Sequence, residues 1–294
     1  MSHILTLISG AAKGLVDDNL MSDIASFLAL PPEWQVLAPS HAAQIKLPTL
    51  SQVAQEKLRA RYADTAIDLI ITTNNDKKQL LVADMESTII EQECLDELAD
   101  KVGIRDKIAD ITERAMRGEL EFEPALRERV KLLQNLPITT LEEIYNERVT
   151  LMPGAQTLIA TLKQNGTYCA LVSGGFTFYA QRIAELLGFD FYQSNNLGIQ
   201  DERLDGTVID PILGRSAKAE ILEKISATRG LALSQTIAVG DGSNDLAMID
   251  IAGFGVAFRA KPAVAAAANI CVNHGDLTAL LYIQGYRKAD FAKV

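Results

Sequence analysis

The chain is poor in the residues that mark several classes of protein. Among its 294 residues are three cysteines, three histidines and one tryptophan. The cysteines (Cys94, Cys169 and Cys271) stand far apart, which argues against a disulfide framework and against the spacing of a zinc site. They fit a reducing compartment, so we expect a cytoplasmic protein. The scattered histidines argue against a Ser-His-Asp triad or an H-E-x-x-H metal site.

Long apolar runs and basic clusters are also missing. No apolar stretch reaches about 18 residues without a charge, so we expect no membrane-spanning helix. Acidic residues interrupt the first 30 positions, which argues against a secretory signal. The formal net charge is −10 and no basic stripe offsets it, so we expect no nucleic-acid partner. With 48% hydrophobic and 22% charged residues, the composition is typical of a globular protein with an ordinary core.

The first quarter of the chain has the pattern of a small α+β domain, which we place at residues 1–75. The predicted strands are residues 4–8, 34–38, 43–47 and 65–72, and the predicted helices are 15–28 and 50–61. The order βαββαβ indicates a ferredoxin-like, or ACT-like, fold. A regulatory role and a dimerisation or packing role fit this domain equally, and no residue set in it identifies a ligand. A polar connection follows at residues 73–78.

Residues 76–294 have the pattern of a doubly wound, Rossmann-like α/β domain. Short apolar runs alternate with helical stretches, which predicts a parallel sheet with helices on both faces. The predicted strands are residues 79–83, 168–172, 236–239 and 254–258, and the predicted helices are 154–165, 176–187, 217–228 and 245–251. Asp205 and Gly206 predict a hairpin turn outside this sheet, between strands 197–203 and 207–209.

The first two core strands are unusually far apart in the sequence. Asp84 and Ser173 both end such strands, yet 89 positions separate them, whereas a parallel crossover needs only about a dozen residues. The excess, about residues 91–150, has helical periodicity and many charges. Its predicted helices are residues 95–102, 107–116, 123–133 and 141–149. We therefore predict a helical cap inserted beside the edge of the sheet that carries the functional loops.

Residues able to perform chemistry follow three of the predicted core strands. They are Asp84 and Glu86 after the first, Ser173-Gly174-Gly175 after the second, and Asp241, Asn244 and Asp245 after the third, with Lys218 at the start of the helix before that third strand. The carboxyl ends of parallel strands meet at one edge of a sheet, so these residues are expected to converge.

This combination suits phosphoryl transfer. Asp84 and Asp241 supply the hard oxygen ligands that Mg²⁺ prefers, and Asp84 can also attack phosphorus to give an aspartyl phosphate. Lys218 and the Ser173 hydroxyl can stabilise charge on the phosphoryl oxygens, while Glu86 can act as acid and base. Each residue alone is more simply a cap, a turn former or a solvated side chain. The four elements together, in this order and at strand ends, favour a phosphatase.

The motifs resemble a known family. Residues 84–88, 171–176, Lys218 and 240–245 are similar to the four motifs of the haloacid-dehalogenase-like (HAD) phosphatases. Residues 91–94, 112–118 and 122–130 resemble the cap of the phosphoserine phosphatase family, and the likeness covers about residues 79–285. It implies hydrolysis of O-phospho-L-serine to L-serine and phosphate, the final step of serine biosynthesis, with Mg²⁺.

The resemblance also implies a role for each site residue. Asp84 would be the nucleophile and a metal ligand, and position 86 the acid and base, with its backbone carbonyl on the metal. Asp241 would complete the protein's metal ligands, and Asp245 would support them. The implied substrate contacts are Glu93 to the ammonium, Arg129 to the carboxylate, and Ser173, Gly174, Lys218 and Asn244 to the phosphate. Met116 and Phe122 would either line the cap pocket or simply pack there.

One residue departs from the family pattern. The first motif usually has Asp at the position of Glu86, whose stem is one methylene longer. Glu86 could still reach the leaving oxygen, could serve one step less well, or could mark a degraded relative. We favour a working enzyme because every other motif residue is intact.

Two further hypotheses stay open. One is a phosphatase for another small phosphomonoester, which would have no need of Glu93 and Arg129. The other is a regulatory, amino-acid-sensing protein whose active site is weakened at Glu86. The sequence predicts a small-molecule substrate as the partner and leaves open a homodimer.

Overall fold

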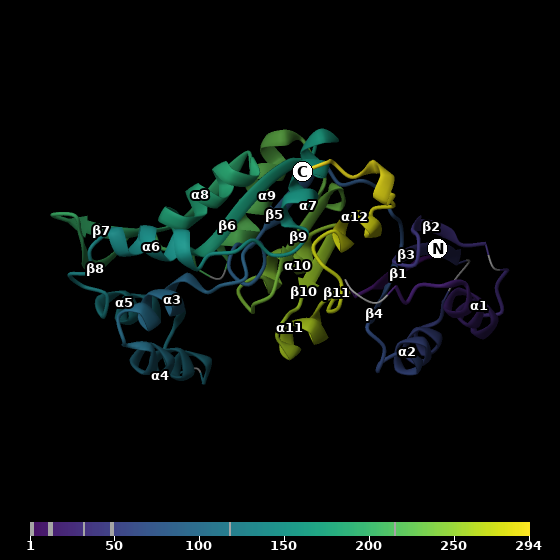
Figure 1. The fold of residues 1–294 in the computed structure, drawn as a ribbon, viewed down its shortest axis with the longest axis horizontal. Helices are drawn as coiled ribbons and strands as arrows, with labels where there is room; N and C mark the ends of the chain where they lie inside the picture. The colour runs from purple at the N-terminus through teal and green to yellow at the C-terminus, as the bar shows by residue number, and fades with distance from the viewer. Residues whose placement is uncertain (1–2, 11–13, 32, 48–49, 118, 215) are drawn as a thin grey trace.

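The molecule has three parts, arranged along its longest axis (Figure 1). A computed structural model describes residues 3–10, 14–31, 33–47, 50–117, 119–214 and 216–294. A small N-terminal domain and a group of inserted helices lie at opposite ends of a central α/β domain. None of the helices described combines the length and apolar character needed to cross a membrane.

The N-terminal domain has the predicted ferredoxin-like order. Its elements are β1 (His3–Ser9), α1 (Asp18–Phe27), β2 (Gln35–Ala38), β3 (Ala42–Leu47), α2 (Gln52–Arg61) and β4 (Ile67–Thr72). The strands form an antiparallel sheet in the order β2-β3-β1-β4. Leu5 and Leu7 of β1 are fully buried against Ile24 of α1 and Leu58 of α2. Alternation along β1 therefore buries one face of the sheet beneath both helices.

The central sheet is mainly parallel, and among the described residues it has seven strands in the order β11-β10-β9-β5-β6-β7-β8. They are β5 (Leu80–Ala83), β6 (Tyr168–Phe176), β7 (Phe191–Gln200), β8 (Arg203–Ile209), β9 (Thr236–Gly240), β10 (Phe254–Phe258) and β11 (Ile270–Val272). Strands β6 and β9 both pair in parallel with β5, which therefore lies in the middle of the sheet. The functional loops after these three strands are neighbours for that reason.

Helices cover both faces of the sheet, as the doubly wound prediction requires. They are α7 (Ala155–Gln164), α8 (Thr177–Leu187), α9 (Ala217–Arg229), α10 (Leu246–Ile251), α11 (Pro262–Ala267) and α12 (Ala279–Ile283). Leu81 and Ala83 of β5 share a core with residues of α7, α8 and α12. Leu80 and Val82 point the other way, into a core formed with α9 and α10. A strand buried on both faces reads as a continuous apolar run, as this one does.

The hairpin prediction was wrong in its turn and its place. The turn falls at Asp201 and Glu202, whose φ angles are 50° and 58°, and the hairpin β7–β8 forms one edge of the sheet. Asp205 and Gly206 lie inside β8. The Asp205 carboxylate accepts a hydrogen bond from the backbone N–H of Thr207 (2.8 Å), and the pairing register shifts at this point. The Asp-Gly pair thus forms an irregularity inside β8 and does not mark the end of a strand.

The inserted helices are α3 (Cys94–Lys101), α4 (Arg105–Met116), α5 (Phe122–Lys131) and α6 (Thr139–Glu147). Backbone pairing joins them to the central domain at two places among the described residues. One is an isolated bridge between Ile90 and Leu151, where the chain enters and leaves the cap. The other joins the α5–α6 connection to β8, where Asn135 N–H donates to the Leu204 carbonyl (2.8 Å) and Leu204 N–H to the Leu136 carbonyl (2.9 Å).

One buried carboxylate joins the N-terminal domain to the central domain. Asp68, on β4, is 3% exposed. Its oxygens accept hydrogen bonds from the backbone N–H groups of Asn273, His274 and Gly275, at 2.8–3.2 Å. The loop that follows β11 therefore wraps a side chain of the other domain. His274 itself is exposed in this loop.

Candidate active site

Asp84 follows the central strand and is held by the backbone. Its N–H donates to the carbonyl of Val239 on β9 (3.0 Å), so it continues the sheet for one residue. Its Oδ1 accepts a hydrogen bond from the N–H of Met85 (2.8 Å). The Met85 carbonyl then accepts bonds from three successive N–H groups, those of residues 88–90. This tight turn fixes the Asp84 side chain at the edge of the sheet, where it is only 5% exposed.

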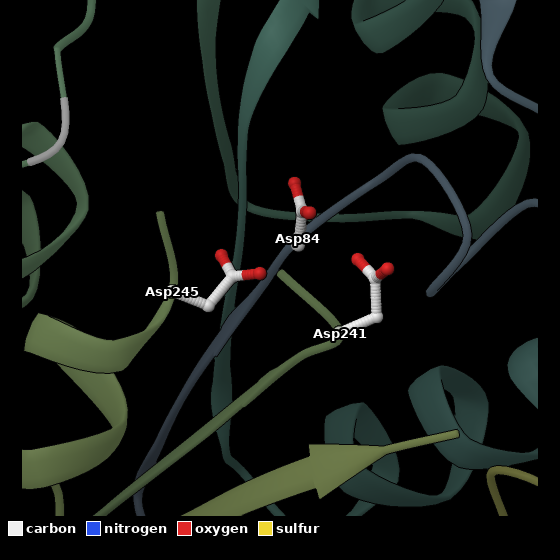
Figure 2. A group of neighbouring side chains, drawn as sticks. All are labelled: Asp84, Asp241 and Asp245. Atoms are coloured by element: carbon white, nitrogen blue, oxygen red, sulfur yellow. The ribbon is translucent and has the colours of Figure 1, made fainter. Parts of the chain in front are cut away.

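Two further carboxylates meet Asp84. Figure 2 shows Asp241 and Asp245, from the loop after β9, on either side of it. Each of the three offers an oxygen within 4.8 Å of the others, and all three are buried. Close packing allows this, because a Cβ at Gly240 would lie 2.2 Å from Cγ of Asp245. An all-oxygen, acidic donor set is what a hard divalent cation requires.

Lys218, on the first turn of α9, is the cation of this cluster. Its Nζ lies 2.6 Å from Oδ1 of Asp84 and 2.5 Å from Oδ1 of Asp245. Burial lowers the pKa of the Lys218 ammonium, but the two carboxylates raise it more, so the group stays charged. Burial and then Asp245 raise the pKa of Asp84 well above its ordinary value, against the effect of Lys218. One ammonium thus faces three carboxylates, and a divalent cation fits the excess negative charge.

The two flanking aspartates differ in their partners. Both oxygens of Asp245 are engaged, Oδ1 by Lys218 and Oδ2 by the N–H of Gly242 (3.0 Å). Asp241 is held through its backbone, where its carbonyl accepts from the N–H of Lys261 (3.2 Å). Burial, followed by the charges of Glu93 and Asp245, raises the pKa of Asp241 to about 6. Among the described residues no hydrogen bond or ion pair reaches the Asp241 carboxylate, whereas both oxygens of Asp245 are bonded.

The Glu86 side chain reaches the cap. Its Oε1 accepts a hydrogen bond from the backbone N–H of Cys94 (2.8 Å), the first residue of α3. Its carboxylate also lies against the backbone of residues 173–175, which we call the phosphate loop, because a Cβ at Gly175 would be 2.5 Å from Oε2. Burial, followed by the charge of Glu93, raises the pKa of Glu86 to about 8. The longer stem thus spans the gap between core and cap, and a carboxyl group with this pKa can carry a proton at neutral pH.

Ser173 and Gly174 lie in the last part of β6, which extends beyond the predicted end at residue 172, and the pairing with β7 is irregular there. Side-chain hydrogen bonds hold this segment in place. Ser173 Oγ accepts a hydrogen bond from the N–H of Gly175 (2.9 Å). The carbonyl of Gly174 accepts from Nδ2 of Asn195 (2.8 Å), whose Oδ1 accepts in turn from the N–H of Leu213 (2.8 Å). Sequence reasoning missed Asn195, because the first half of β7 carries no strong strand pattern. The signal it offered was only an amide residue beside a hairpin.

Asn244 lies at the same edge of the sheet. A Cβ at Gly242 would be 2.3 Å from its Oδ1, so the Asn244 amide folds over that glycine. The residues that the sequence predicted at the strand ends therefore lie together at one edge of the central sheet.

The cap carries the predicted pair of opposite charges. Glu93 precedes α3, and its Oε1 accepts a hydrogen bond from the Ser87 hydroxyl (2.8 Å). Arg129, on α5, is half-buried and donates from Nε to the carbonyl of Ala125 (3.3 Å). Burial lowers the pKa of Arg129, and three acidic neighbours, Asp96, Glu86 and Glu93, counter that effect. Within the part of the chain that the structure describes, Arg129 forms no ion pair, so its guanidinium is available to a ligand.

Two other cap predictions have different outcomes. Phe122, the first residue of α5, lies above the phosphate loop, since a Cβ at Gly174 would be 3.6 Å from its ring. The side chain of Met116 and all of Gly118 lie outside the described residues.

Comparisons with known proteins agree with this geometry. Residues 81–250 match the model of the haloacid dehalogenase-like hydrolase family. A phosphoserine phosphatase of Archaeoglobus fulgidus is 41% identical over 229 residues, which are 77% of this chain and 66% of that protein. The match thus spans slightly less than two thirds of that relative's length. A phosphoserine phosphatase of Methanocaldococcus jannaschii is 42% identical over a match that covers 70% of this chain and 97% of that protein.

The fold is similar to a solved structure over almost the whole chain. A HAD family hydrolase from Salmonella enterica serovar Typhi superposes with a TM-score of 0.87, covering 96% of this chain and 98% of its own at 28% identity. Its match includes the N-terminal domain as well as the α/β domain. The chain therefore belongs to the haloacid dehalogenase-like hydrolases and, within them, to the phosphoserine phosphatase family.

Proposed function

We propose that this chain hydrolyses O-phospho-L-serine to L-serine and phosphate. One observation carries the proposal: a buried aspartate bonded to Lys218 lies beneath a cap that presents Glu93 and Arg129, and Arg129 forms no ion pair with any described residue. The first pair suits a phosphate and the second suits the two charges of an amino acid. The names of the relatives in Archaeoglobus and Methanocaldococcus support the same substrate.

In the first step the Asp84 carboxylate attacks phosphorus. Oδ1 is occupied by Lys218 and the Met85 N–H, which leaves Oδ2 to form the new O–P bond. The bond between phosphorus and the serine oxygen breaks, and Glu86 gives its proton to that oxygen. Serine leaves as the neutral alcohol, and Asp84 carries the phosphoryl group.

In the second step Glu86, now ionised, takes a proton from a water molecule. The water oxygen forms a bond to phosphorus as the bond between phosphorus and Asp84 breaks. Phosphate is released, Glu86 is protonated again and Asp84 returns to a carboxylate. The short approach of the Glu86 carboxylate to Gly175 supports this role.

Electrostatic groups of the chain stabilise the transferring phosphoryl group. Lys218 faces the nucleophile, and the Ser173 hydroxyl, the Gly174 backbone and Asn244 lie at the same edge of the sheet. Mg²⁺, held by Asp84, Asp241 and the backbone carbonyl at position 86 with Asp245 in support, would offset repulsion between phosphate and carboxylate.

The cap pair accounts for the choice of substrate. A half-buried guanidinium binds a carboxylate in a planar, bidentate manner, and Arg129 has no competing acid bonded to it among the described residues. Glu93 supplies the opposite charge for the ammonium group. A sugar phosphate carries neither an ammonium nor a carboxylate group, so it would gain no attraction from either charge of this pair.

The test is release of phosphate from phosphoserine in the presence and absence of Mg²⁺. We expect Asp84→Asn to abolish turnover while the protein stays folded. Asp64→Asn is the matched control, because Asp64 is exposed in the N-terminal domain. Phosphate release by Asp84→Asn at the parent rate, or no Mg²⁺-dependent release by the parent, would contradict the proposal.

We also propose a division at about residue 75, with the catalytic domain at 76–294 and a cap at about 91–150. A cytoplasmic location is supported by the free cysteines Cys94, Cys169 and Cys271. The homodimer stays a prediction that sedimentation can test.

A further inference from the structure

Ser87 occupies an unusual position between the nucleophile and the cap. Its φ angle is 52°, in the left-handed region that non-glycine residues rarely adopt. Such a conformation persists only where surrounding contacts determine it, and it often marks a functional site. Ser87 lies in the tight turn after Asp84, in which the Met85 carbonyl accepts three backbone hydrogen bonds.

The contacts of Ser87 and its neighbour show what this conformation achieves. Two consecutive residues of the turn bind two consecutive residues of the cap: Glu86 accepts from the N–H of Cys94 (2.8 Å), and Ser87 donates its hydroxyl to the carboxylate of Glu93 (2.8 Å). A regular extended chain would send these neighbouring side chains in opposite directions. The left-handed residue lets both reach the start of α3.

Glu93 depends on this contact for its position. It is exposed, it precedes α3, and its side chain makes no capping bond to that helix. Within the described residues the Ser87 hydroxyl is the hydrogen-bond donor that the structure gives to this carboxylate. An exposed glutamate without a partner would sample several rotamers, and ordering it upon binding would weaken affinity.

We propose that Ser87 is a positioning residue for substrate selection, whose hydroxyl holds the Glu93 carboxylate ready for the ammonium group of phosphoserine. This inference rests on the proposed function. The bond uses one oxygen of Glu93 and leaves Oε2 for the substrate. Among the described residues the Ser87 hydroxyl forms no hydrogen bond to Asp84, Ser173 or Lys218, so we expect its effect to fall on selection of the amino-acid substrate.

The experiment compares two substrates. Phosphoserine carries an ammonium group and p-nitrophenyl phosphate does not, so the ratio of their kcat/KM values measures the contribution of Glu93. For Ser87→Ala we expect this ratio to fall about 3- to 10-fold, mainly through KM for phosphoserine, which corresponds to ordering one flexible side chain. Glu93→Gln should lower the ratio further, on the order of 10- to 100-fold.

Two additional variants separate positioning from a structural effect. Ser87→Gly also lacks the hydroxyl but relieves the left-handed strain, so we expect the same loss of ratio with a higher melting temperature than Ser87→Ala. The double variant Ser87→Ala/Glu93→Gln should match Glu93→Gln alone, because the hydroxyl acts only through Glu93. Additive losses, or an unchanged ratio in both Ser87 variants, would overturn the inference.

The outcomes also distinguish this inference from the proposed function. If the parent protein does not hydrolyse phosphoserine, the proposed function fails and the inference fails with it. If the parent hydrolyses phosphoserine and both Ser87 variants keep the full ratio, the function stands and only the role of Ser87 is refuted.

Discussion

Asp241→Asn is expected to make the metal-free protein more stable while it abolishes activity. The structure brings three buried carboxylates together around one ammonium group. Asp241 has the pKa raised to about 6 from an ordinary 3.8, so its ionisation in the folded protein is opposed by about two pH units. At about 1.4 kcal/mol per pH unit, the ionised carboxylate costs roughly 3 kcal/mol at neutral pH. Asparagine keeps the shape and removes the charge.

The assay is thermal unfolding in EDTA and in Mg²⁺ at pH 7.5. In EDTA we expect Asp241→Asn to gain about 1–3 kcal/mol of unfolding free energy, or a few degrees in melting temperature. In saturating Mg²⁺ the parent should gain roughly 3 kcal/mol at 100 times its Kd, while the variant gains little. The stability advantage of Asp241→Asn in EDTA should therefore be largely cancelled in saturating Mg²⁺. Asp64→Asn, at an exposed position, should change neither value by more than about 0.5 kcal/mol.

The pH dependence supplies a second check. Because the pKa of Asp241 is higher in the folded protein than in the unfolded chain, the folded state binds the proton more tightly. The destabilisation is complete above about pH 6 and fades as the pH falls toward 3.8. The advantage of Asp241→Asn in EDTA should shrink over the same range. A variant that is less stable than the parent in EDTA at pH 7.5 would refute the reasoning.

Three other changes follow from contacts of the site and the domain junction. Glu86→Gln should lower kcat for phosphoserine about 10²- to 10⁴-fold, whereas Glu86→Asp should retain measurable turnover; equal rates for Glu86→Gln and the parent would show that position 86 is not the acid. Gly175→Ala places a Cβ 2.5 Å from Oε2 of Glu86, so kcat for phosphoserine should fall at least about 10-fold. The KM for phosphoserine should change little in steady-state kinetics, because Glu93 and Arg129 are untouched. Asp68→Ala removes the acceptor for the N–H groups of residues 273–275 and should cost about 1–3 kcal/mol in urea unfolding; a loss no larger than that of an exposed aspartate would contradict the buried contact.

The convergence of the catalytic loops could be predicted because it follows from local patterns. Asp84, Ser173 and Asp241 each end an apolar run, and parallel strands place their carboxyl ends together. The continuous apolar run of β5 indicated burial on both faces, and both cores are present. The long interval before the second strand indicated an insertion, because a crossover needs so few residues.

The contacts between core and cap could not be predicted in the same way. The bonds from Glu86 to Cys94 and from Ser87 to Glu93 depend on how an inserted group of helices packs on the loop that precedes it. The bracing by Asn195 depends on β7, whose polar residues form a strand only because β6 and β8 lie on either side. Sequence patterns describe single segments, and these interactions belong to pairs of segments.

The attachment of the cap to β8 limits how the enzyme can move. Backbone bonds of Asn135, Leu136 and Ile138 tie the α5–α6 connection to the hairpin, with N–H to O distances of 2.8–3.0 Å. Each such bond is worth about 1 kcal/mol, so lifting the whole insert would cost several kcal/mol in every catalytic cycle. Bending confined to α4 and the start of α5 breaks none of them. We therefore expect substrate to enter through a partial hinge motion of α4 and the start of α5. The α6 side of the cap should stay fixed to the sheet during this motion.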